Sequence, residues 1–489
     1  MTTPSRAPDA DLTAFDVVVL GAGTGGLGAA RGVKKAGRSV ALVEAFRPGG
    51  DCTWFGCVPS KAMLETARTV HRARTSADRG VRGEVSADVA AVLAHAREVR
   101  ETVYADESPR VLKRQGIDLV QGRARFVARD VVEVTGADGS VRRLRGRRFV
   151  LATGGRARVP DLPGLAGSGY LTNETVWDLT QSPGHLVVLG GGPIGCELSQ
   201  AFARLGVPVT LVQSQPRLLP RDDARAAGIV LDVLRREGVT VHLSAQAERV
   251  ERAGADVVVH LAGDTQVHGT HLLVSTGRTP NTEDLGLELA GVRVDGAGRV
   301  AVDDHLRTSA EHVWAVGDCA SALTFTHVAD DQARVAVRNL LFADRSGRFA
   351  KPDALPARWH DEHVPWVTFT DPEVAHVGVT EAQAFERWGE RALVARVPMR
   401  LVDRARCAGE TDGFVQLVAG PPRLGVGALR PLVGMTAVAP VAGELLFPGV
   451  AAVRQGTPVA RLAQATAAYP TWSVATRIAA AMFFGGFAG

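Results

Sequence analysis

The sequence lacks several features that would point to particular classes of protein. Its 489 residues include only five cysteines, too few for a disulfide-stabilised secreted domain. No apolar run reaches the roughly 20 residues of a transmembrane helix, and the N-terminus has no apolar core of the kind found in signal peptides. The formal net charge is only +4, which does not favour a nucleic-acid partner. We therefore expect a cytoplasmic protein with no membrane span and no nucleic-acid partner.

Glycine, by contrast, is abundant, and it forms a recognisable pattern near the N-terminus. Residues 16–44 read DVVVLGAGTGGLGAARGVKKAGRSVALVE, in which an apolar run is followed by Gly21, Gly23 and Gly26, a helix-like stretch and a second apolar run. Such glycines allow a tight turn and let the backbone approach a pyrophosphate at the start of a helix. The second run ends in Glu44, an acid suited to hydrogen-bond a ribose diol. The pattern predicts a dinucleotide site.

The same pattern occurs a second time. Residues 186–213 read LVVLGGGPIGCELSQAFARLGVPVTLVQ, with Gly190, Gly192 and Gly195 at the same spacing. One such fingerprint is a weak signal, but two copies, each between strand-like runs, are a strong one. Two dinucleotide sites on one chain favour electron transfer between the two bound nucleotides.

The second copy ends in a neutral residue, Gln213, where an acid would repel a 2′-phosphate. Arg217 and Arg221 follow in the next loop. We therefore favour NADPH as the second dinucleotide and leave NADH open. The alternative reading of these arginines is an ordinary solvated loop.

Two of the five cysteines lie close together in GGDCTWFGCVPSK, residues 49–61. Lys61 follows Cys57 by four residues, so on a helix the two share a face. A thiol near a helix N-terminus and beside a cation ionises more easily, which favours a redox role for Cys52 and Cys57. A zinc site would need a second Cys/His pair at ligand spacing, so no metal is expected. The remaining thiols stand alone and are expected to be buried and inert: Cys196, Cys319 and Cys407.

Together with ATGG at 152–155, STGRTPN at 275–281 and VGDCA at 316–320, these motifs give the chain a clear resemblance. From about residue 16 to about 480 it resembles the class I pyridine nucleotide-disulfide oxidoreductases, a family that includes dihydrolipoamide dehydrogenase, glutathione reductase and mercuric reductase. The resemblance implies bound FAD, NAD(P)H as electron donor, and a homodimer.

The resemblance also implies an α/β fold with two Rossmann-like dinucleotide-binding domains and a C-terminal α+β interface domain. The expected boundaries are 1–155 for the first part of the FAD-binding domain and 156–284 for the NAD(P)-binding domain. The chain is expected to return to the FAD-binding domain over 285–355 and to end in the dimerisation domain, 356–489.

The family's motif carries residue roles over to this chain. It implies that Cys57 is the thiolate stacked on the flavin and that Cys52 exchanges with substrate. It places Lys61 near flavin N5, paired with Glu197, and it places Asp318 near the ribityl-phosphate region. His327 is expected to begin a helix that points at the flavin pyrimidine ring. The full set of expected cofactor-binding positions is Gly21, Gly23, Gly26, Glu44, Gly50, Asp51, Lys61, Thr153, Gly154, Gly190, Gly192, Gly195, Gln213, Arg217, Gly277, Gly317, Asp318 and His327.

The C-terminal domain departs from the family's thiol-disulfide members. Where those members carry His-Pro-Thr-x-x-Glu across the dimer interface, residues 469–474 read YPTWSV, so Tyr469 replaces the histidine and Val474 the glutamate. A phenol with a pKa of about 10 is poorly matched to proton transfer at neutral pH. Tyr469 either fills an interface position or contacts substrate beside Cys52. A tyrosine here resembles mercuric reductase, but no cysteine pair follows Cys407 to deliver a metal.

Two further departures lie at the nucleotide sites. Asp51 stands where many members have threonine, so its charge must turn away from the FAD pyrophosphate or be compensated by cations. Pro193 stands where some members have a bulky residue that gates the nicotinamide pocket, and a rigid proline cannot swing as a gate.

These observations support three hypotheses. The leading one is an FAD-dependent NAD(P)H oxidoreductase that passes electrons through a Cys52–Cys57 disulfide to a small acceptor, such as a disulfide, a metal species or a quinone. The second is a flavin-only NAD(P)H:quinone or oxygen oxidoreductase that does not need the disulfide. The third is a redox-sensing binding protein with low turnover.

Overall fold

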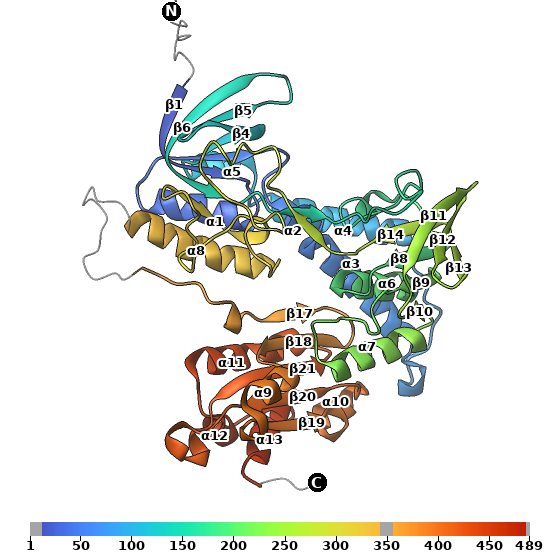
Figure 1. Cartoon of the computed structure of the whole chain (residues 1–489). Helices are drawn as coiled ribbons and strands as arrows, with labels where there is room; N and C mark the ends of the chain where they lie inside the picture. Colours follow the sequence, from blue (N-terminus) through green and yellow to red (C-terminus); the bar gives the residue numbers. More distant parts are fainter. Residues whose placement is uncertain (1–11, 343–355, 486–489) are drawn as a thin grey trace, which may run out of the picture. The chain divides into compact units, whose positions relative to one another are not determined.

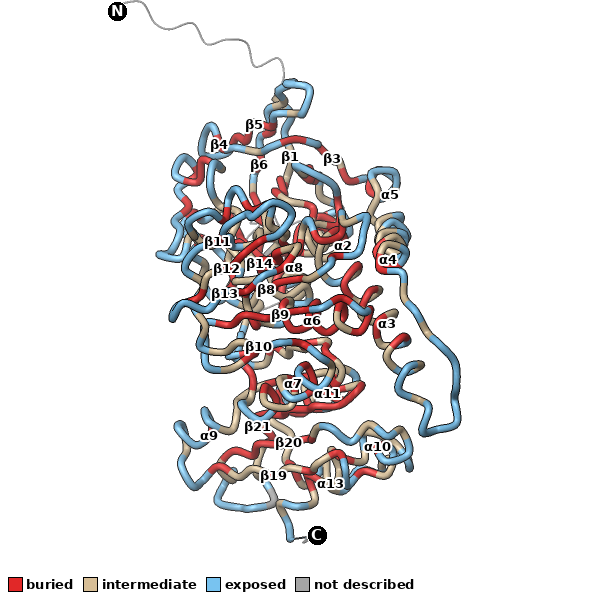
Figure 2. Tube along the Cα trace, turned by 90° about the vertical axis from the view of Figure 1, so that its right-hand side faces the viewer, coloured by how far each residue is buried: buried red, intermediate tan, exposed pale blue. Residues whose placement is uncertain are grey.

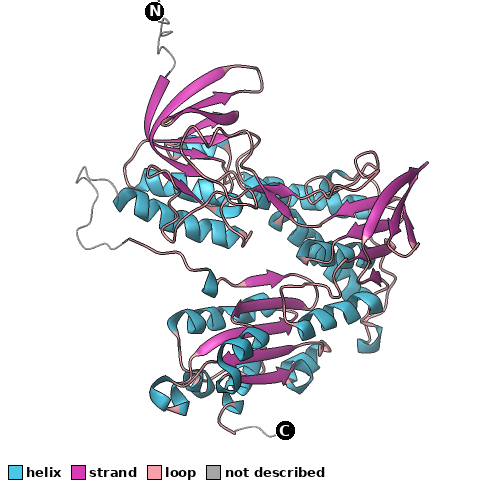
Figure 3. Cartoon of the chain, viewed as in Figure 1, coloured by secondary structure: helices cyan, strands magenta, loops and turns pink. Residues whose placement is uncertain are grey.

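The computed structural model describes residues 12–342 and 356–485, which fall into two compact units (Figure 1). The first unit combines the described residues up to 59 with 96–158, 278–342 and 356–360. The second combines 60–95, 159–277 and the described residues from 361 onward. Figure 3 shows that each unit is built from sheets covered by helices.

The first unit is organised around a seven-stranded sheet with the order β3-β2-β1-β6-β5-β4, in which β16 also pairs with β6. Strands β1, β2, β3, β6 and β16 pair in parallel, whereas β4 and β5 add an antiparallel extension. The strands are β1 (Leu12–Leu20), β2 (Val40–Glu44), β3 (Asp118–Gln121), β4 (Arg123–Ala128), β5 (Val131–Thr135), β6 (Val141–Leu151) and β16 (Val313–Ala315).

The parallel strands of this sheet are buried on both faces, which explains their continuous apolar sequences. Along β1, Val17 and Val19 pack into one apolar cluster and Val18 and Leu20 into another, as the twofold alternation of a strand requires. Helices α1 (Thr24–Lys35) and α8 (Thr326–Phe342) belong to the first face and lie side by side. The other helices in or entering this unit are α2 (Gly50–Trp54), α3 (Cys57–Arg74), α4 (Val89–Tyr104) and α5 (Pro109–Arg114).

The second unit contains a four-stranded parallel sheet with the order β10-β9-β8-β14 and a three-stranded antiparallel sheet, β11-β12-β13. A buried apolar cluster joins residues of the two sheets. The strands are β8 (Leu186–Leu189), β9 (Val209–Val212), β10 (Thr240–His242), β11 (Ala247–Ala253), β12 (Asp256–Leu261), β13 (Gln266–Gly269) and β14 (His271–Val274), and the helices are α6 (Pro193–Arg204) and α7 (Ala224–Arg236).

The C-terminal part of the second unit is a five-stranded antiparallel sheet with the order β17-β18-β21-β20-β19. Helix α11 packs on β18 and β21, and α13 packs on β19 and β20 (Figure 1). The strands are β17 (Trp366–Thr368), β18 (Glu373–Gly378), β19 (Leu393–Pro398), β20 (Phe414–Ala419) and β21 (Leu432–Ala439). The helices are α9 (Glu381–Trp388), α10 (Asp403–Ala408), α11 (Ala442–Gln455), α12 (Val459–Gln464) and α13 (Val474–Met482).

A small two-stranded sheet pairs β7 (Gly155–Ala157) with β15 (Arg278–Pro280), so the chain leaves and re-enters the first unit at adjacent points. Buried residues are concentrated along the sheet strands, while the connection between α3 and α4 is exposed (Figure 2). Among the helices in residues 12–342 and 356–485, none has both the length and the apolar character to cross a bilayer.

Candidate active site

The first glycine fingerprint forms the turn between β1 and α1. Gly21 has φ +99°, and a Cβ on it would lie 2.3 Å from the carbonyl oxygen of Ala152. A Cβ on Gly26 would lie 1.8 Å from the Gly21 carbonyl oxygen, and one on Gly50 would lie 2.6 Å from the Cα of Gly23. The backbone therefore makes a close-packed cradle that side chains would fill, as a bound pyrophosphate requires. The residues of this turn therefore fit the pyrophosphate of FAD.

Glu44, at the end of β2, holds the backbone next to this turn through its carboxylate. Its Oε2 accepts a hydrogen bond from the Ala22 N–H (2.7 Å), and its Oε1 accepts one from the Phe46 N–H (2.7 Å). Burial raises the pKa of Glu44, and the backbone N–H donors oppose that rise. The carboxylate thus supports the loop at the position that the fingerprint assigns to ribose recognition.

The second fingerprint repeats this geometry between β8 and α6. Gly190 has φ +107°, and a Cβ on Gly195 would lie 1.9 Å from the Gly190 carbonyl oxygen. Gly192 is the residue before α6, which begins with Pro193. Gln213 matches Glu44, because its Oε1 accepts a hydrogen bond from the Gly191 N–H (3.1 Å).

The arginine predicted to face a 2′-phosphate is anchored within its own loop. The guanidinium of Arg217 donates to the backbone oxygens of Pro220 (2.6 Å) and Asp222 (3.1 Å). The Gln213 side chain donates to the Arg217 backbone oxygen (3.2 Å). Arg221 is exposed.

The two neighbouring cysteines lie on separate helices, with Cys52 in α2 and Cys57 as the first residue of α3. Both are free thiols; Cys52 is half-buried and Cys57 exposed. Cys57 Sγ lies 3.2 Å from Oγ1 of Thr326, the first residue of α8. A hydrogen bond with Cys57, burial and the charge of Cys57 together raise the pKa of the Cys52 thiol. In the reduced pair, negative charge therefore belongs on Cys57, with Cys52 holding the proton.

Asp51, the acid beside Cys52, is compensated by a cation. Arg278 Nη1 lies 3.2 Å from Asp51 Oδ2, and Arg278 Nε lies 2.9 Å from Asp318 Oδ2. One guanidinium thus joins the redox motif to the segment that carries Asp318 and Gly317. The Gly317 N–H in turn donates to Gln332 of α8 (2.8 Å).

Two family motifs are joined by hydrogen bonds between Thr153 and Asn281. Thr153 Oγ1 donates to the Asn281 backbone oxygen (2.6 Å), and the Asn281 side chain donates back to the Thr153 backbone oxygen (3.1 Å). Gly154 and Gly277 have φ values of +69° and +129°, which only glycine adopts readily. Asn281, Arg278 and Thr326 were not among the predicted site residues, although Arg278 and Asn281 lie inside the STGRTPN motif.

Lys61 and Glu197 are brought together within the second unit. Lys61 Nζ on α3 lies 3.0 Å from Glu197 Oε2 on α6, and Glu197 is only 5% exposed. The second carboxylate oxygen accepts the Phe369 N–H (2.9 Å). Phe369 belongs to the segment after β17, about 170 residues away in sequence, and no motif pointed to it.

Tyr469 is 72% exposed, and its hydroxyl donates to Asp403 Oδ2 on α10 (2.9 Å). This hydrogen bond and the carboxylate's charge raise the pKa of Tyr469 above its usual value. The phenol is therefore a poorer acid than an isolated tyrosine. Its hydroxyl proton is directed at Asp403, which leaves the oxygen lone pairs for other contacts.

The remaining predicted residues have simpler environments. His327 is the second residue of α8, after Thr326, and its ring stacks on Phe325 with centroids 5.4 Å apart. Cys196 and Cys319 are buried as expected, and burial raises the pKa of each. Cys407 is exposed on α10, so the expectation that all three isolated thiols are buried is wrong. No cluster of metal-ligating side chains occurs among the described residues.

Comparison with known proteins gives matches along nearly the whole chain. The pyridine nucleotide-disulphide oxidoreductase family matches residues 15–333, and the dimerisation domain of the same family matches residues 364–480. Mercuric reductase of Streptomyces lividans is 34% identical over 476 residues, covering 96% of both chains. Dihydrolipoyl dehydrogenase of Thermus scotoductus is 32% identical over 471 residues, covering 94% of this chain and 95% of its own.

Solved structures confirm the predicted fold class. The Cu(II) complex of the HOCl-induced flavoprotein disulfide reductase RclA from Escherichia coli is 27% identical, with a TM-score of 0.83 over 96% of this chain and 99% of its own. LpdA from Mycobacterium tuberculosis is 29% identical, with a TM-score of 0.85 and the same coverage.

Proposed function

Because the chain belongs to the pyridine nucleotide-disulphide oxidoreductase family, whose members bind FAD and use NAD(P)H, we propose that it reduces a small acceptor through a Cys52–Cys57 disulfide. Bound FAD supplies two-electron transfer between the nicotinamide and the disulfide. NADPH and one proton convert the disulfide to two thiols and NADP⁺. Reoxidation of the thiols delivers the two electrons to the acceptor.

The difference between the two thiols is the observation that carries this proposal. Cys57 lies at the N-terminus of α3 and against the Thr326 hydroxyl, where negative charge is stabilised. Cys52 is more buried and has a raised pKa. Cys57 is thus suited to hold charge against the flavin, and the family resemblance assigns contact with the acceptor to Cys52.

The environment of Tyr469 favours an acceptor that needs no acid catalyst. A histidine at this position would protonate a departing thiolate, whereas a phenol with a raised pKa is a poor proton donor at neutral pH. Activated disulfides, thiophilic metal or metalloid species and quinones meet this condition. Alkyl disulfides with basic leaving groups do not.

The donor in this proposal is NADPH, and the working form is a homodimer in the cytoplasm. The neutral Gln213 supports NADPH, because it replaces the carboxylate that would repel a 2′-phosphate. The match of residues 364–480 to a dimerisation domain supports the homodimer. The low cysteine content suits a reducing compartment.

Anaerobic titration with NADPH tests the proposal. Two-electron reduction should produce a broad long-wavelength absorbance from a thiolate beside oxidised flavin, and Cys57→Ser should abolish it. The Cys52→Ser/Cys57→Ser double variant should lose acceptor reduction by at least about 10²-fold. Wild-type protein without the band, or a double variant that keeps turnover, would contradict the disulfide route. The second result would favour direct reduction of quinones or oxygen by the flavin.

A further inference from the structure

The ammonium of Lys61 lies between a carboxylate and an aromatic ring. Lys61 Nζ is 3.0 Å from Glu197 Oε2 and 4.3 Å from the centroid of the Phe369 ring. The Lys61 side chain is 35% exposed, so it is partly removed from water. A cation at this distance from a ring face is attracted by the ring's quadrupole, and partial removal from water strengthens the attraction.

Phe369 also holds the other member of the ion pair. Its backbone N–H donates to Glu197 Oε1 (2.9 Å), so each carboxylate oxygen has its own partner. The main-chain contact does not depend on the side chain at position 369. A substitution there can remove the ring from Lys61 and still leave an N–H for Glu197.

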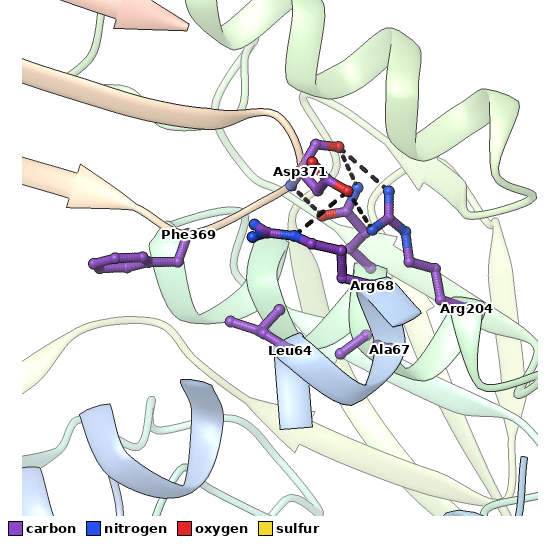
Figure 4. A pocket seen from close by; sticks show the side chains of 8 residues that line it. Leu64, Ala67, Arg68, Arg204, Phe369 and Asp371 are labelled. Atoms are coloured by element: carbon purple, nitrogen blue, oxygen red, sulfur yellow. Dashed lines mark hydrogen bonds and ion pairs between the residues drawn. The ribbon is translucent and has the colours of Figure 1, made fainter. Parts of the chain in front are cut away.

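The segment that carries Phe369 is fixed to α6, the helix that carries Glu197. The Asp371 carboxylate pairs with Arg204 Nη1 (2.8 Å), and the Asp371 backbone N–H donates to the Gln200 side chain (2.7 Å). Arg204 is buried and also pairs with Glu237 (2.7 Å). Figure 4 shows the Phe369 ring directed away from these ion pairs. Helix α6 therefore places both the carboxylate and the ring that hold Lys61.

We infer that Phe369 is a positioning residue that holds the Lys61 ammonium in place through its ring and orients Glu197 through its main chain. The ring attracts the cation through its quadrupole, so it fixes the position of the ammonium without a hydrogen-bond acceptor atom. The inference rests on the proposed function and on the family resemblance, which places Lys61 near the flavin. It adds a third member to the Lys61–Glu197 pair.

The first test measures the reactivity of the Lys61 amine. Labelling of Lys61 by an amine-reactive reagent at fixed pH would be quantified by mass spectrometry relative to Lys113 in wild type, Phe369→Leu and Phe369→Tyr. Loss of the ring should increase labelling by about 3- to 30-fold, the range of a cation–π contact, and Phe369→Tyr should match wild type. Phe385→Leu is the matched control, because it makes the same change at an exposed position on α9. Unchanged labelling in Phe369→Leu would overturn the inference.

The second test measures how the loss of the ring affects flavin reduction. In Phe369→Leu, stopped-flow reduction of the bound flavin by NADPH should slow by about 3- to 30-fold, and the long-wavelength band should shift or weaken. Phe369→Tyr should restore both. Increased labelling with an unchanged rate and band would overturn the positioning role, whereas a missing band in wild type would instead contradict the proposed function. If Phe369→Leu loses FAD or unfolds, Phe369→Met replaces the ring with a longer apolar side chain, and the same outcomes apply.

Discussion

At the scale of single residues, the Gln213 side chain bears on the choice between NADPH and NADH, because glutamine and glutamate differ there by one atom and one charge. Its Oε1 accepts the Gly191 N–H just as Glu44 accepts the Ala22 N–H in the first fingerprint, so Gln213→Glu can keep the loop's hydrogen bond. The new carboxylate would repel a 2′-phosphate and bind a ribose diol. We expect kcat/KM for NADPH to fall by about tenfold or more, since like charges in contact cost over 1.4 kcal/mol, and kcat/KM for NADH to rise.

Gln266→Glu, which adds the same charge at an exposed position of β13, is the control and should change neither value. Steady-state kinetics with both nucleotides make the comparison. Equal preference for NADPH in wild type and Gln213→Glu would remove the argument for NADPH.

Residues fixed by local geometry could be predicted from the sequence, and residues that approach from a distance could not. Gly21 and Gly26 follow from spacing alone, because a Cβ at either position would overlap a backbone oxygen. Thr326 and Phe369 carry no motif, and they meet Cys57 and Glu197 only because the chain returns after more than 150 residues. The exposure of Cys407 was missed because an isolated thiol is by default expected to be buried, although its neighbour Arg406 is typical of a surface helix.

At the scale of elements, one buried carboxylate joins the loop before α7 to β17. Asp222 is 6% exposed, and its Oδ1 accepts the Trp366 indole N–H (2.8 Å). Burial raises the pKa of Asp222 to about 6, Arg217 and Arg221 oppose the rise, and Asp223 adds to it. The native state therefore binds this proton more tightly than the unfolded chain, whose carboxyl has a pKa of 3.8.

This difference makes stability depend on pH. The free energy of unfolding falls as the pH rises from about 4 to about 6, because in this pH range the native state holds more protons than the unfolded chain. Above pH 6 the buried charge costs on the order of 2–3 kcal/mol. Asp222→Asn keeps an acceptor for Trp366 and should raise the urea midpoint at pH 8 more than at pH 5. An equal shift at both values, or a loss at pH 8, would contradict the raised pKa.

The order of strands and helices was predictable where the apolar pattern and the glycine spacing agree, as in the strand–turn–helix units at β1–α1 and β8–α6. Which strands and side chains pair with one another was not predictable. Strand β6 carries five arginines in eight residues, and four of them meet acids, through the pairs Arg142–Asp118, Arg143–Glu133, Arg145–Asp130 and Arg147–Asp16. Three of these acids lie on the strands β1, β3 and β5, and Asp130 lies in the turn between β4 and β5. The neutralisation of the basic strand therefore depends on sheet register, which sequence spacing does not give.

At the scale of the whole molecule, the exposed position of Tyr469 suits a surface that a second copy covers. Tyr469 is 72% exposed, is hydrogen-bonded to Asp403 and lies within a dimerisation domain, and we propose that it acts on a neighbouring chain. The motif at residues 469–474 already showed that Tyr469 stands where the family has histidine. It could not predict Asp403, which lies 66 residues earlier and accepts the hydrogen bond of the Tyr469 hydroxyl.

Mixed dimers test whether Tyr469 acts across the interface. Tyr469→Phe and Cys52→Ser homodimers should each lose most acceptor reduction, the first by about tenfold, the value of one hydrogen bond between the hydroxyl and the acceptor. A dimer with one chain of each kind has one site that pairs an intact Cys52 with the intact Tyr469 of the other chain. If Tyr469 acts in trans, differently tagged heterodimers should recover about half of the wild-type turnover, since a twofold dimer has two equivalent sites. If it acts within its own chain, both sites carry a defect and nothing is recovered; wild-type turnover in the Tyr469→Phe homodimer would instead show that the hydroxyl has no part in the reaction.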